Sequence, residues 1–205
     1  MAESDKKPDK KPAKKTTKKS GASRKATKAK ASRAAAPSKA ASAEPKLNVC
    51  FVAAEVAPFA KTGGLADVSA ALPAQLKRDG HDVRVFMPLY STIRFEQAPK
   101  PVEFLHHVPI RLGEQVFHFS VFTTRLPDSE VDVYFIGCPP LYDRDGIYTG
   151  DWDDHLRFAF LSQAALKCCQ FMGWAPDIVH ANDWHTALVP LYLQTLFAWD
   201  RNIFG

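Results

Sequence analysis

The sequence predicts an α/β protein built on a doubly wound, mostly parallel sheet. An almost continuous apolar run, LNVCFVAA at 47–54, is followed by a segment with helical periodicity at 65–77 and by a second apolar run at 81–90. Short apolar runs without alternation are typical of parallel strands buried on both faces, and a strand, a helix and a strand in this order form a βαβ unit. A helix, a strand and another helix follow at 156–199. This order favours a layered α/β fold over a barrel or a sandwich.

The helix expected at 65–77 has one apolar face. Its apolar residues recur at helical spacing, and they are Leu65, Val68, Ala71, Leu72 and Leu76. The basic residues and the glycine of KRDG then supply a helix end. A right-handed crossover through this helix would make strands 47–54 and 81–90 parallel.

The middle of the chain predicts strands of a different kind. Three segments, 101–112, 115–126 and 131–139, are rich in Val, Phe and Ile and are joined by short polar turns. The second contains FHFSVF, whose period-two alternation is typical of a strand with one buried face. We expect some of these strands to pair antiparallel.

The last part of the chain returns to helices and a strand. A polar loop, PPLYDRDGIYTGDWDD at 139–154, leads into an expected core-facing helix at 156–172. That helix is predicted from apolar residues at helical spacing, namely Leu156, Ala159, Phe160, Ala164, Leu166 and Phe171. The segment PDIVHANDW at 176–184 then predicts a short strand, and 185–199 predicts a closing helix.

The net charge of the protein comes from its N-terminal tail. Residues 1–46 hold 15 Lys and Arg against 4 Asp and Glu, whereas the rest of the chain holds 12 against 18. The tail at 1–45 has no aromatic residue and no Leu, Ile or Val, so it cannot bury enough apolar surface to order itself. We expect a disordered tail and a folded domain at 46–205. The tail is either a solvated linker or a weak contact for polyanions.

Composition also limits where the protein can act. The tail lacks the apolar core of a secretory signal, and no segment has the roughly 18 uninterrupted apolar residues of a membrane-spanning helix. The cysteines form no CxxC pair, and Cys50 and Cys138 lie in apolar runs, where a buried reduced thiol is the usual role. We expect a cytoplasmic protein without membrane contact. The Ser and Ala content of the tail leaves a plastid transit peptide as the alternative.

A candidate anion site follows the first strand, in the sequence KTGGLAD. Gly63 and Gly64 lack a Cβ, can take positive φ and let a ligand approach the unpaired N–H groups of the next helix. Lys61 adds a mobile positive charge to the positive end of the helix dipole, so both would attract an anion. The pattern is neither GxGxxG nor a P-loop, so an ordinary strand-to-helix turn is the alternative.

A second polar cluster, HANDWH at 180–185, follows a later strand. Ligands of doubly wound sheets bind beyond the carboxyl ends of the strands, so we expect this cluster and KTGGLAD to share one cleft. His185 would lie in the first turn of a helix, where the dipole favours a neutral imidazole. Asp183 is a candidate helix N-cap, and we interpret His180 as structural.

Two long motifs, KTGGLADVSAALP and PDIVHANDWHTALVPLYL, closely resemble the bacterial glycogen synthase and plant starch synthase family. The resemblance runs from about 47 to 199 and includes LYDRDGIYTG and RFAFLSQAAL in the expected order. It implies a retaining glucosyltransferase of the GT-B type, with two Rossmann-like domains facing a cleft. Such an enzyme moves glucose from ADP-glucose to the non-reducing end of an α-1,4-glucan, glycogen or starch, and needs no metal or organic cofactor.

The resemblance also implies roles for six residues. Lys61, Gly63 and Gly64 would bind the nucleotide-sugar donor, with the glycines close to its diphosphate. Glu55, Asp67 and His185 would line the sugar end of the site as catalytic residues. The residues alone leave alternatives: Glu55 as a solvated loop carboxylate, and Asp67 as a first-turn acid that complements the helix dipole.

Relatives in this family continue beyond the point that corresponds to Gly205. We therefore expect residues 46–205 to be part of an acceptor-side, N-terminal domain, with the second domain absent and no catalysis by this piece alone. Two other classes remain: a non-catalytic carbohydrate- or phosphate-binding remnant, and a nucleic-acid-associated protein that acts through its tail. The tail supports the last only by charge, since it has no aromatic residue to stack on bases.

Overall fold

The computed structural model describes residues 45–205. In this part of the chain six strands form one mixed sheet in the order β3-β4-β5-β2-β1-β6. Their bounds are β1 (Asn48–Val52), β2 (Asp82–Pro88), β3 (Val102–Leu112), β4 (Gln115–Arg125), β5 (Asp132–Gly137) and β6 (Ile178–Ala181). The predictions for the basic tail, its disorder and its contact with polyanions, lie outside the described residues.

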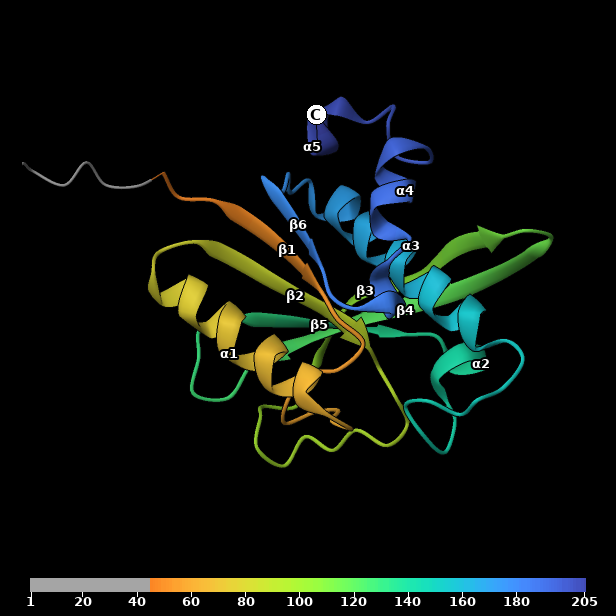
Figure 1. Ribbon diagram of the computed structural model, residues 1–205, viewed down its shortest axis with the longest axis horizontal. Coiled ribbons are helices and arrows are strands. Elements are labelled where there is room, and N and C mark those ends of the chain that lie inside the picture. The colour runs from red at the N-terminus through yellow and green to blue at the C-terminus, as the bar shows by residue number, and fades with distance from the viewer. Residues whose placement is uncertain (1–44) are drawn as a thin grey trace, which may run out of the picture. The chain divides into compact units, whose positions relative to one another are not determined.

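The sheet combines a parallel core with an antiparallel edge. β1 pairs in parallel with β2 and β6, and β2 pairs in parallel with β5. β3 and β4 form an antiparallel hairpin that joins the sheet at β5 (Figure 1). Val49 to Val52 of β1 are at most 3% exposed, as a strand buried on both faces requires. Both predictions, parallel for the continuous apolar runs and antiparallel for part of the middle, are confirmed.

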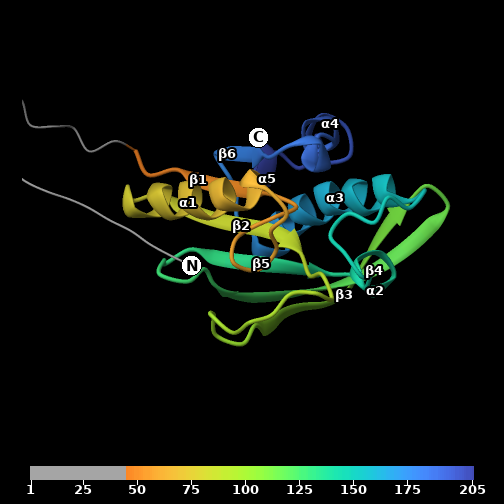
Figure 2. The same cartoon turned by 60° about the horizontal axis from the view of Figure 1, so that its bottom comes forward.

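Two long helices, α1 (Gly64–Arg78) and α3 (Asp154–Met172), pack on the sheet. α1 leads from β1 to β2, and α3 leads from β5 back to β6, so the two crossovers run in opposite directions along the sheet. Right-handed crossovers of opposite direction place their helices on opposite faces. Figure 2 shows the two helices over different parts of the sheet. The shorter elements are α2 (Pro139–Tyr142), the 3-10 helix η1 (Trp184–Thr186), α4 (Val189–Gln194) and α5 (Arg201–Phe204).

The closing helix predicted at 185–199 is wrong. The structure has the separate elements η1 and α4 there, and α4 ends at Gln194. Pro190 lies in the first turn of α4, where a missing N–H costs nothing, whereas inside a continuous helix it would remove a hydrogen bond and clash with the preceding turn. At the other end, the Thr195 hydroxyl donates to the Leu191 carbonyl at 2.7 Å.

The four cysteines of the chain are free thiols inside the core. None is more than 1% exposed, and the Sγ atoms of Cys50 on β1 and Cys169 on α3 lie 3.8 Å apart. Burial raises the pKa of the Cys138 thiol to about 11, so it stays protonated near neutral pH. The buried, reduced role predicted for Cys50 and Cys138 is confirmed.

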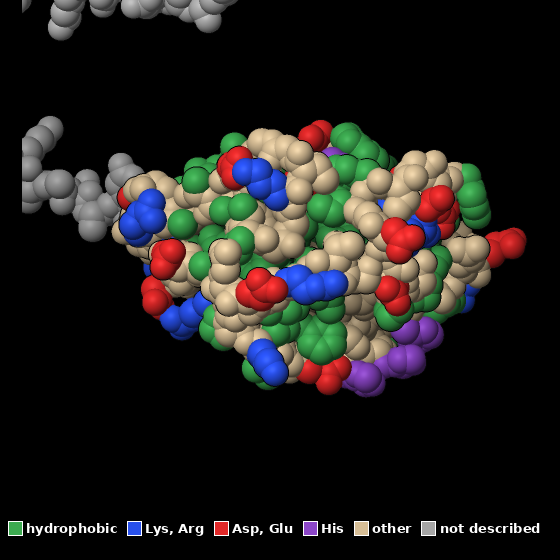
Figure 3. All heavy atoms as spheres, turned by 90° about the horizontal axis from the view of Figure 1, so that it is seen from below, with side chains coloured by type: hydrophobic (Ala, Val, Ile, Leu, Met, Phe, Trp, Pro, Cys, Tyr) green, Lys and Arg blue, Asp and Glu red, His purple; other side chains and the backbone are tan. Residues whose placement is uncertain are grey.

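The described surface carries mixed charges. Figure 3 shows Lys and Arg side chains lying among Asp and Glu on one face, which therefore has no continuous basic stripe of the kind that nucleic acids bind. Histidines gather at one edge of this face (Figure 3). In the β3–β4 hairpin, His107 and His118 stack with ring centroids 4.1 Å apart. Among residues 45–205, no helix is long and apolar enough to cross a membrane.

Candidate active site at the carboxyl ends of two strands

The two polar motifs meet at one edge of the sheet. Val52 at the end of β1 is paired with Ala181 at the end of β6, so the segments that follow both strands leave the sheet side by side. Asn182 fastens them together, because its backbone N–H and its side-chain amide both donate to the Val52 carbonyl, at 3.2 and 2.9 Å. The two motifs therefore begin at neighbouring strand ends, and the single cleft expected between KTGGLAD and HANDWH stays a prediction.

Glu55 holds the loop that carries KTGG. Its Oε2 accepts from the backbone N–H groups of Thr62 at 2.6 Å and Gly63 at 3.3 Å. Its Oε1 accepts from the Thr62 hydroxyl at 2.7 Å and from the Tyr148 hydroxyl at 2.6 Å. The residue is 2% exposed. The alternative of a solvated loop carboxylate is therefore wrong, because the carboxylate is buried and four donors surround it.

The charge of Glu55 is stabilised where it lies. Burial by itself would raise the pKa of this carboxyl group, but the hydrogen bonds from Tyr148, Thr62 and Gly63 outweigh burial and hold the pKa below its ordinary value. Glu55 is consequently an anion at neutral pH.

Lys61 and Asp67 form an ion pair at the entrance of α1. The Lys61 Nζ lies 2.6 Å from Oδ1 and 2.8 Å from Oδ2 of Asp67, and the two side chains are 52% and 58% exposed. Asp67 lies in the first turn of α1, where a carboxylate complements the dipole, as the alternative for this residue proposed. The pair sits on the surface, within reach of a ligand from solvent.

The glycines leave the helix entrance open. Gly63 is the N-cap of α1 with φ of −150°, and no side chain caps the helix there. The predicted use of positive φ is wrong for both glycines, because Gly63 has an extended backbone and Gly64, the first residue of α1, does not have positive φ. A Cβ at Gly63 or Gly64 would meet no atom within 4 Å. The absence of side chains thus leaves free space over the first turn, where backbone N–H groups point outward.

His185 is buried among aromatic rings. It is 4% exposed, and its ring centroid lies 4.8 Å from Tyr148, 4.6 Å from Phe158 and 4.1 Å from Trp184. Neither ring nitrogen has a hydrogen-bond partner within the described part of the chain. Burial lowers the pKa of the imidazole, against the opposing effect of the charges on Asp183 and Glu55. The expected neutral imidazole is therefore supported by its surroundings.

The turn that presents His185 is strained. Asp183 has φ of 62° and ψ of 179°, a combination that is almost restricted to glycine. Its Oδ1 accepts from the Trp184 N–H at 2.6 Å, so the predicted N-cap role is confirmed, for η1. The Thr186 hydroxyl donates to the Asn182 carbonyl at 2.9 Å and closes the turn.

His180 stacks on Phe51 with centroids 4.7 Å apart, in keeping with a structural role.

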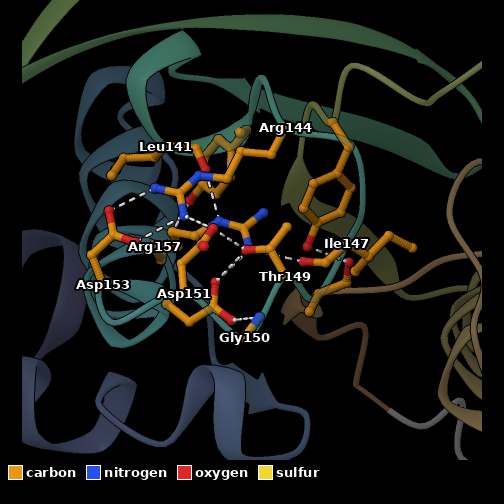
Figure 4. Close-up of polar contacts among 12 residues, drawn as sticks. Leu141, Arg144, Ile147, Thr149, Gly150, Asp151, Asp153 and Arg157 are labelled. Atoms are coloured by element: carbon orange, nitrogen blue, oxygen red, sulfur yellow. Dashed lines mark hydrogen bonds and ion pairs between the residues drawn. The ribbon is translucent and has the colours of Figure 1, made fainter.

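The loop at 143–153 brings Tyr148 to the site, and our sequence reasoning assigned it no role. Its cations and carboxylates pair among themselves: Arg144 donates to Asp151 at 2.8 Å and to Asp153 at 2.6 and 2.8 Å (Figure 4). The loop lines a cavity of about 590 Å³. The lining residues are Asp143, Arg144, Asp145, Gly146, Tyr148, Thr149 and Asp151. One signal was available, because Arg157 is a cation at the start of the mostly apolar motif RFAFLSQAAL.

A family model described as the starch synthase catalytic domain matches residues 48–204. The chain belongs to the starch synthase catalytic domain family. A glycogen synthase of Geobacter sulfurreducens is 45% identical over 167 residues, which cover 78% of this chain and 33% of the relative. A glycogen synthase of Lacticaseibacillus casei is 42% identical over 156 residues, covering 76% and 32%.

A solved starch synthase structure has the same fold. The catalytic domain of starch synthase IV from Arabidopsis thaliana, bound to ADP and acarbose, superimposes with a TM-score of 0.71 at 31% identity, over 78% of this chain and 32% of that one. The predicted family and glycosyltransferase α/β fold are confirmed. This chain spans about a third of the length of these relatives.

In this member of the starch synthase family, the site offers two kinds of chemistry. The open entrance of α1 and the Lys61 ammonium suit an anion. The neutral imidazole of His185 can donate from one nitrogen and accept at the other, which suits sugar hydroxyls. Within residues 45–205, no group of three His, Cys, Asp or Glu side chains could hold a metal ion.

Proposed function

We propose that this chain is the acceptor-side part of a retaining glucosyltransferase that moves glucose from ADP-glucose to the non-reducing end of an α-1,4-glucan. One observation carries the proposal: in a chain of the starch synthase family, the Glu55-held loop, the open end of α1 and the buried His185 converge at one edge of the sheet. We further propose that residues 1–205 bind but do not turn over these substrates.

The proposed roles follow from the charge that develops during donor cleavage. The departing diphosphate gains negative charge, which the Lys61 ammonium and the N–H groups at the start of α1, from Gly64 onward, would stabilise, while Gly63 leaves room for its approach and keeps its N–H on Glu55. The glucosyl group gains positive character, which favours oxygen acceptors on its side of the site. Glu55 and Asp67 supply carboxylates there, and a neutral His185 supplies a hydrogen bond to a sugar hydroxyl.

The choice of donor and acceptor rests on the relatives. The starch synthase IV structure contains ADP and acarbose, and two relatives that cover most of this chain are glycogen synthases. ADP-glucose and an α-1,4-glucan are therefore the first substrates to test, with UDP-glucose as the competing donor.

The decisive experiment uses a chimera as long as the full-length relatives. Residues 1–205 are joined to the remaining C-terminal part of the Geobacter sulfurreducens glycogen synthase, and transfer of labelled glucose to glycogen is measured. We expect transfer from ADP-glucose by the chimera, loss of transfer in His185→Ala, and no effect of Lys100→Ala, an exposed lysine outside the site. A folded chimera that binds glycogen but transfers glucose from neither donor would support a non-catalytic binding remnant instead.

A further inference from the structure

Tyr148 contacts two candidate site residues at once. Its hydroxyl donates to Glu55 Oε1 at 2.6 Å, across 93 positions of sequence. Its ring stacks on the imidazole of His185, with centroids 4.8 Å apart and an interplanar angle of 20°. We propose that Tyr148 is a positioning residue that fixes the Glu55 carboxylate with its hydroxyl and the His185 ring with its aromatic face. This proposal deepens the proposed function and rests on it for the roles of Glu55 and His185.

The hydroxyl contact extends to the KTGG loop. Oε1 of Glu55 has two donors, Thr62 and Tyr148, and only the second comes from outside the loop that Glu55 holds. The other oxygen accepts from the backbone of Thr62 and Gly63. Tyr148 thus ties the glutamate and its loop to a distant part of the chain.

The ring contact matters because His185 has no hydrogen bond to orient it. Both nitrogens are unpartnered in the described part of the chain, so packing against rings sets the direction of the imidazole. Phe158 and Trp184 meet it at 72° and 33°, whereas Tyr148 lies nearly parallel to it. A ring held by packing alone leaves both nitrogens buried and without a hydrogen-bond partner.

A buried arginine places Tyr148. Arg157 of α3 is 0% exposed; its Nε donates to the Leu141 carbonyl at 2.7 Å, and its Nη1 donates to the Ile147 carbonyl at 3.0 Å and to Asp154 Oδ1 at 2.8 Å (Figure 4). Ile147 directly precedes Tyr148, so the backbone that carries the tyrosine is fastened to the core.

The position of Tyr148 also relates it to the cavity. It lines the cavity of about 590 Å³ and is 37% exposed. A ligand in the cavity that contacts Tyr148 would therefore change the positions of both Glu55 and His185 through this one side chain.

The test uses residues 1–205 without substrate and compares Tyr148→Phe, which removes only the hydroxyl, with Tyr148→Leu, which removes the ring. Two readouts are taken by NMR: amide hydrogen exchange at Thr62 and Gly63, and the ring-nitrogen signals and pH titration of His185. We expect Tyr148→Phe to speed the exchange several-fold and to leave the His185 signals in place. We expect Tyr148→Leu to change both, with the titration of His185 moving toward its ordinary range.

Tyr192→Phe is the matched control, a partly buried tyrosine that packs in a separate apolar cluster and should move neither readout. Amide exchange at Thr62 and Gly63 that is unchanged in Tyr148→Phe overturns the proposed role of the hydroxyl. This test does not depend on whether Tyr148→Leu folds. His185 signals that shift equally in Tyr148→Phe and Tyr148→Leu overturn the division between hydroxyl and ring.

The chimera separates this inference from the proposed function. There, Tyr148→Phe should lower kcat about tenfold, as for one lost hydrogen bond, with the KM for ADP-glucose within about twofold of the parent. A parent chimera without activity counts against the proposed function and leaves the two NMR readouts to decide on Tyr148.

Discussion

The Lys61 ammonium lies within 2.8 Å of both carboxylate oxygens of Asp67. The pair joins a residue expected at the donor diphosphate to one expected at the sugar. Because both side chains are more than half exposed, the pair contributes only about 0–1 kcal/mol to stability. An incoming phosphate would compete with Asp67 for the same cation.

Replacing Lys61 should weaken anion binding without unfolding the protein. A charge-assisted hydrogen bond contributes about 1.5–3 kcal/mol, so Lys61→Ala should reduce the affinity of the chain for ADP by about tenfold to a hundredfold. Lys61→Arg should restore part of it, because a planar guanidinium does not reproduce a compact ammonium. Calorimetry with ADP measures the effect, and Lys100→Ala is the control. A change in ADP affinity of less than twofold in Lys61→Ala would leave the ordinary strand-to-helix turn as the explanation of KTGG.

Asp67→Asn should have the opposite effect on ADP. The substitution frees Lys61 and removes a negative charge from the helix entrance, so ADP should bind a few times more tightly. The same calorimetric titration tests this, and weaker binding of ADP would show that Asp67 itself helps to hold the nucleotide.

Glu55 should make stability depend on acid pH. Its pKa is lower in the folded protein than in the unfolded chain, so the unfolded chain takes up protons first as the pH falls. The stabilisation is present above the unfolded pKa and is lost as the pH falls below it and through the lower folded pKa. Glu55→Gln should lower the unfolding free energy at pH 7 by about 1–3 kcal/mol and flatten this dependence. Urea titrations at several pH values measure both effects, with exposed Glu114→Gln as the control.

Asp183 should be one of the few positions where glycine is better than alanine. Both substitutions lose the hydrogen bond to the Trp184 N–H, but only glycine relieves the backbone strain at φ of 62°. Asp183→Gly should therefore be more stable than Asp183→Ala by about 1–3 kcal/mol. The same pair at Glu96, an exposed position with negative φ, should show no such preference. Equal stabilities of the two Asp183 variants would show that the turn relaxes without cost.

Arg157 should be essential for folding of the 143–153 loop. Arg157→Leu leaves the carbonyls of Leu141 and Ile147 without their buried donor, which should cost about 3–5 kcal/mol in chemical denaturation. Arg111→Leu, at an exposed position of β3, should change stability by less than about 0.5 kcal/mol. A loss of less than about 1 kcal/mol in Arg157→Leu would mean that the loop finds other partners.

The parts of the fold that depend on local periodicity could be predicted from the sequence. The apolar runs gave the parallel strands, and the alternation of FHFSVF gave a strand of the hairpin. The spacing at 65–77 gave the helix α1 but not its buried face, because Val68 is 53% exposed and the buried residues are Ala66, Ser69 and Pro73. The closing helix failed because apolar spacing outweighed Pro190 in the prediction. In the structure η1 and α4 are separate, and Pro190 lies in the first turn of α4.

The candidate site was predictable only in part. Motif and strand order placed Glu55, Lys61 and His185 at one sheet edge, because the carboxyl ends of parallel strands lie together. Tyr148 could not be found in this way, since its contact with Glu55 joins residues 93 positions apart through a loop without periodicity. The strain at Asp183 was equally invisible, because it follows from the way the turn closes rather than from the residue type.

Because all four cysteines are buried, the labelling of their thiols can report local opening of the structure. A thiol reagent in solution can reach Cys50, Cys138, Cys168 or Cys169 only after the surrounding structure separates, since none is more than 1% exposed. Labelling rates read by mass spectrometry would therefore give local opening free energies at β1, at the start of α2 and along α3. The same measurement would tell whether a ligand at the sheet edge holds these elements closed.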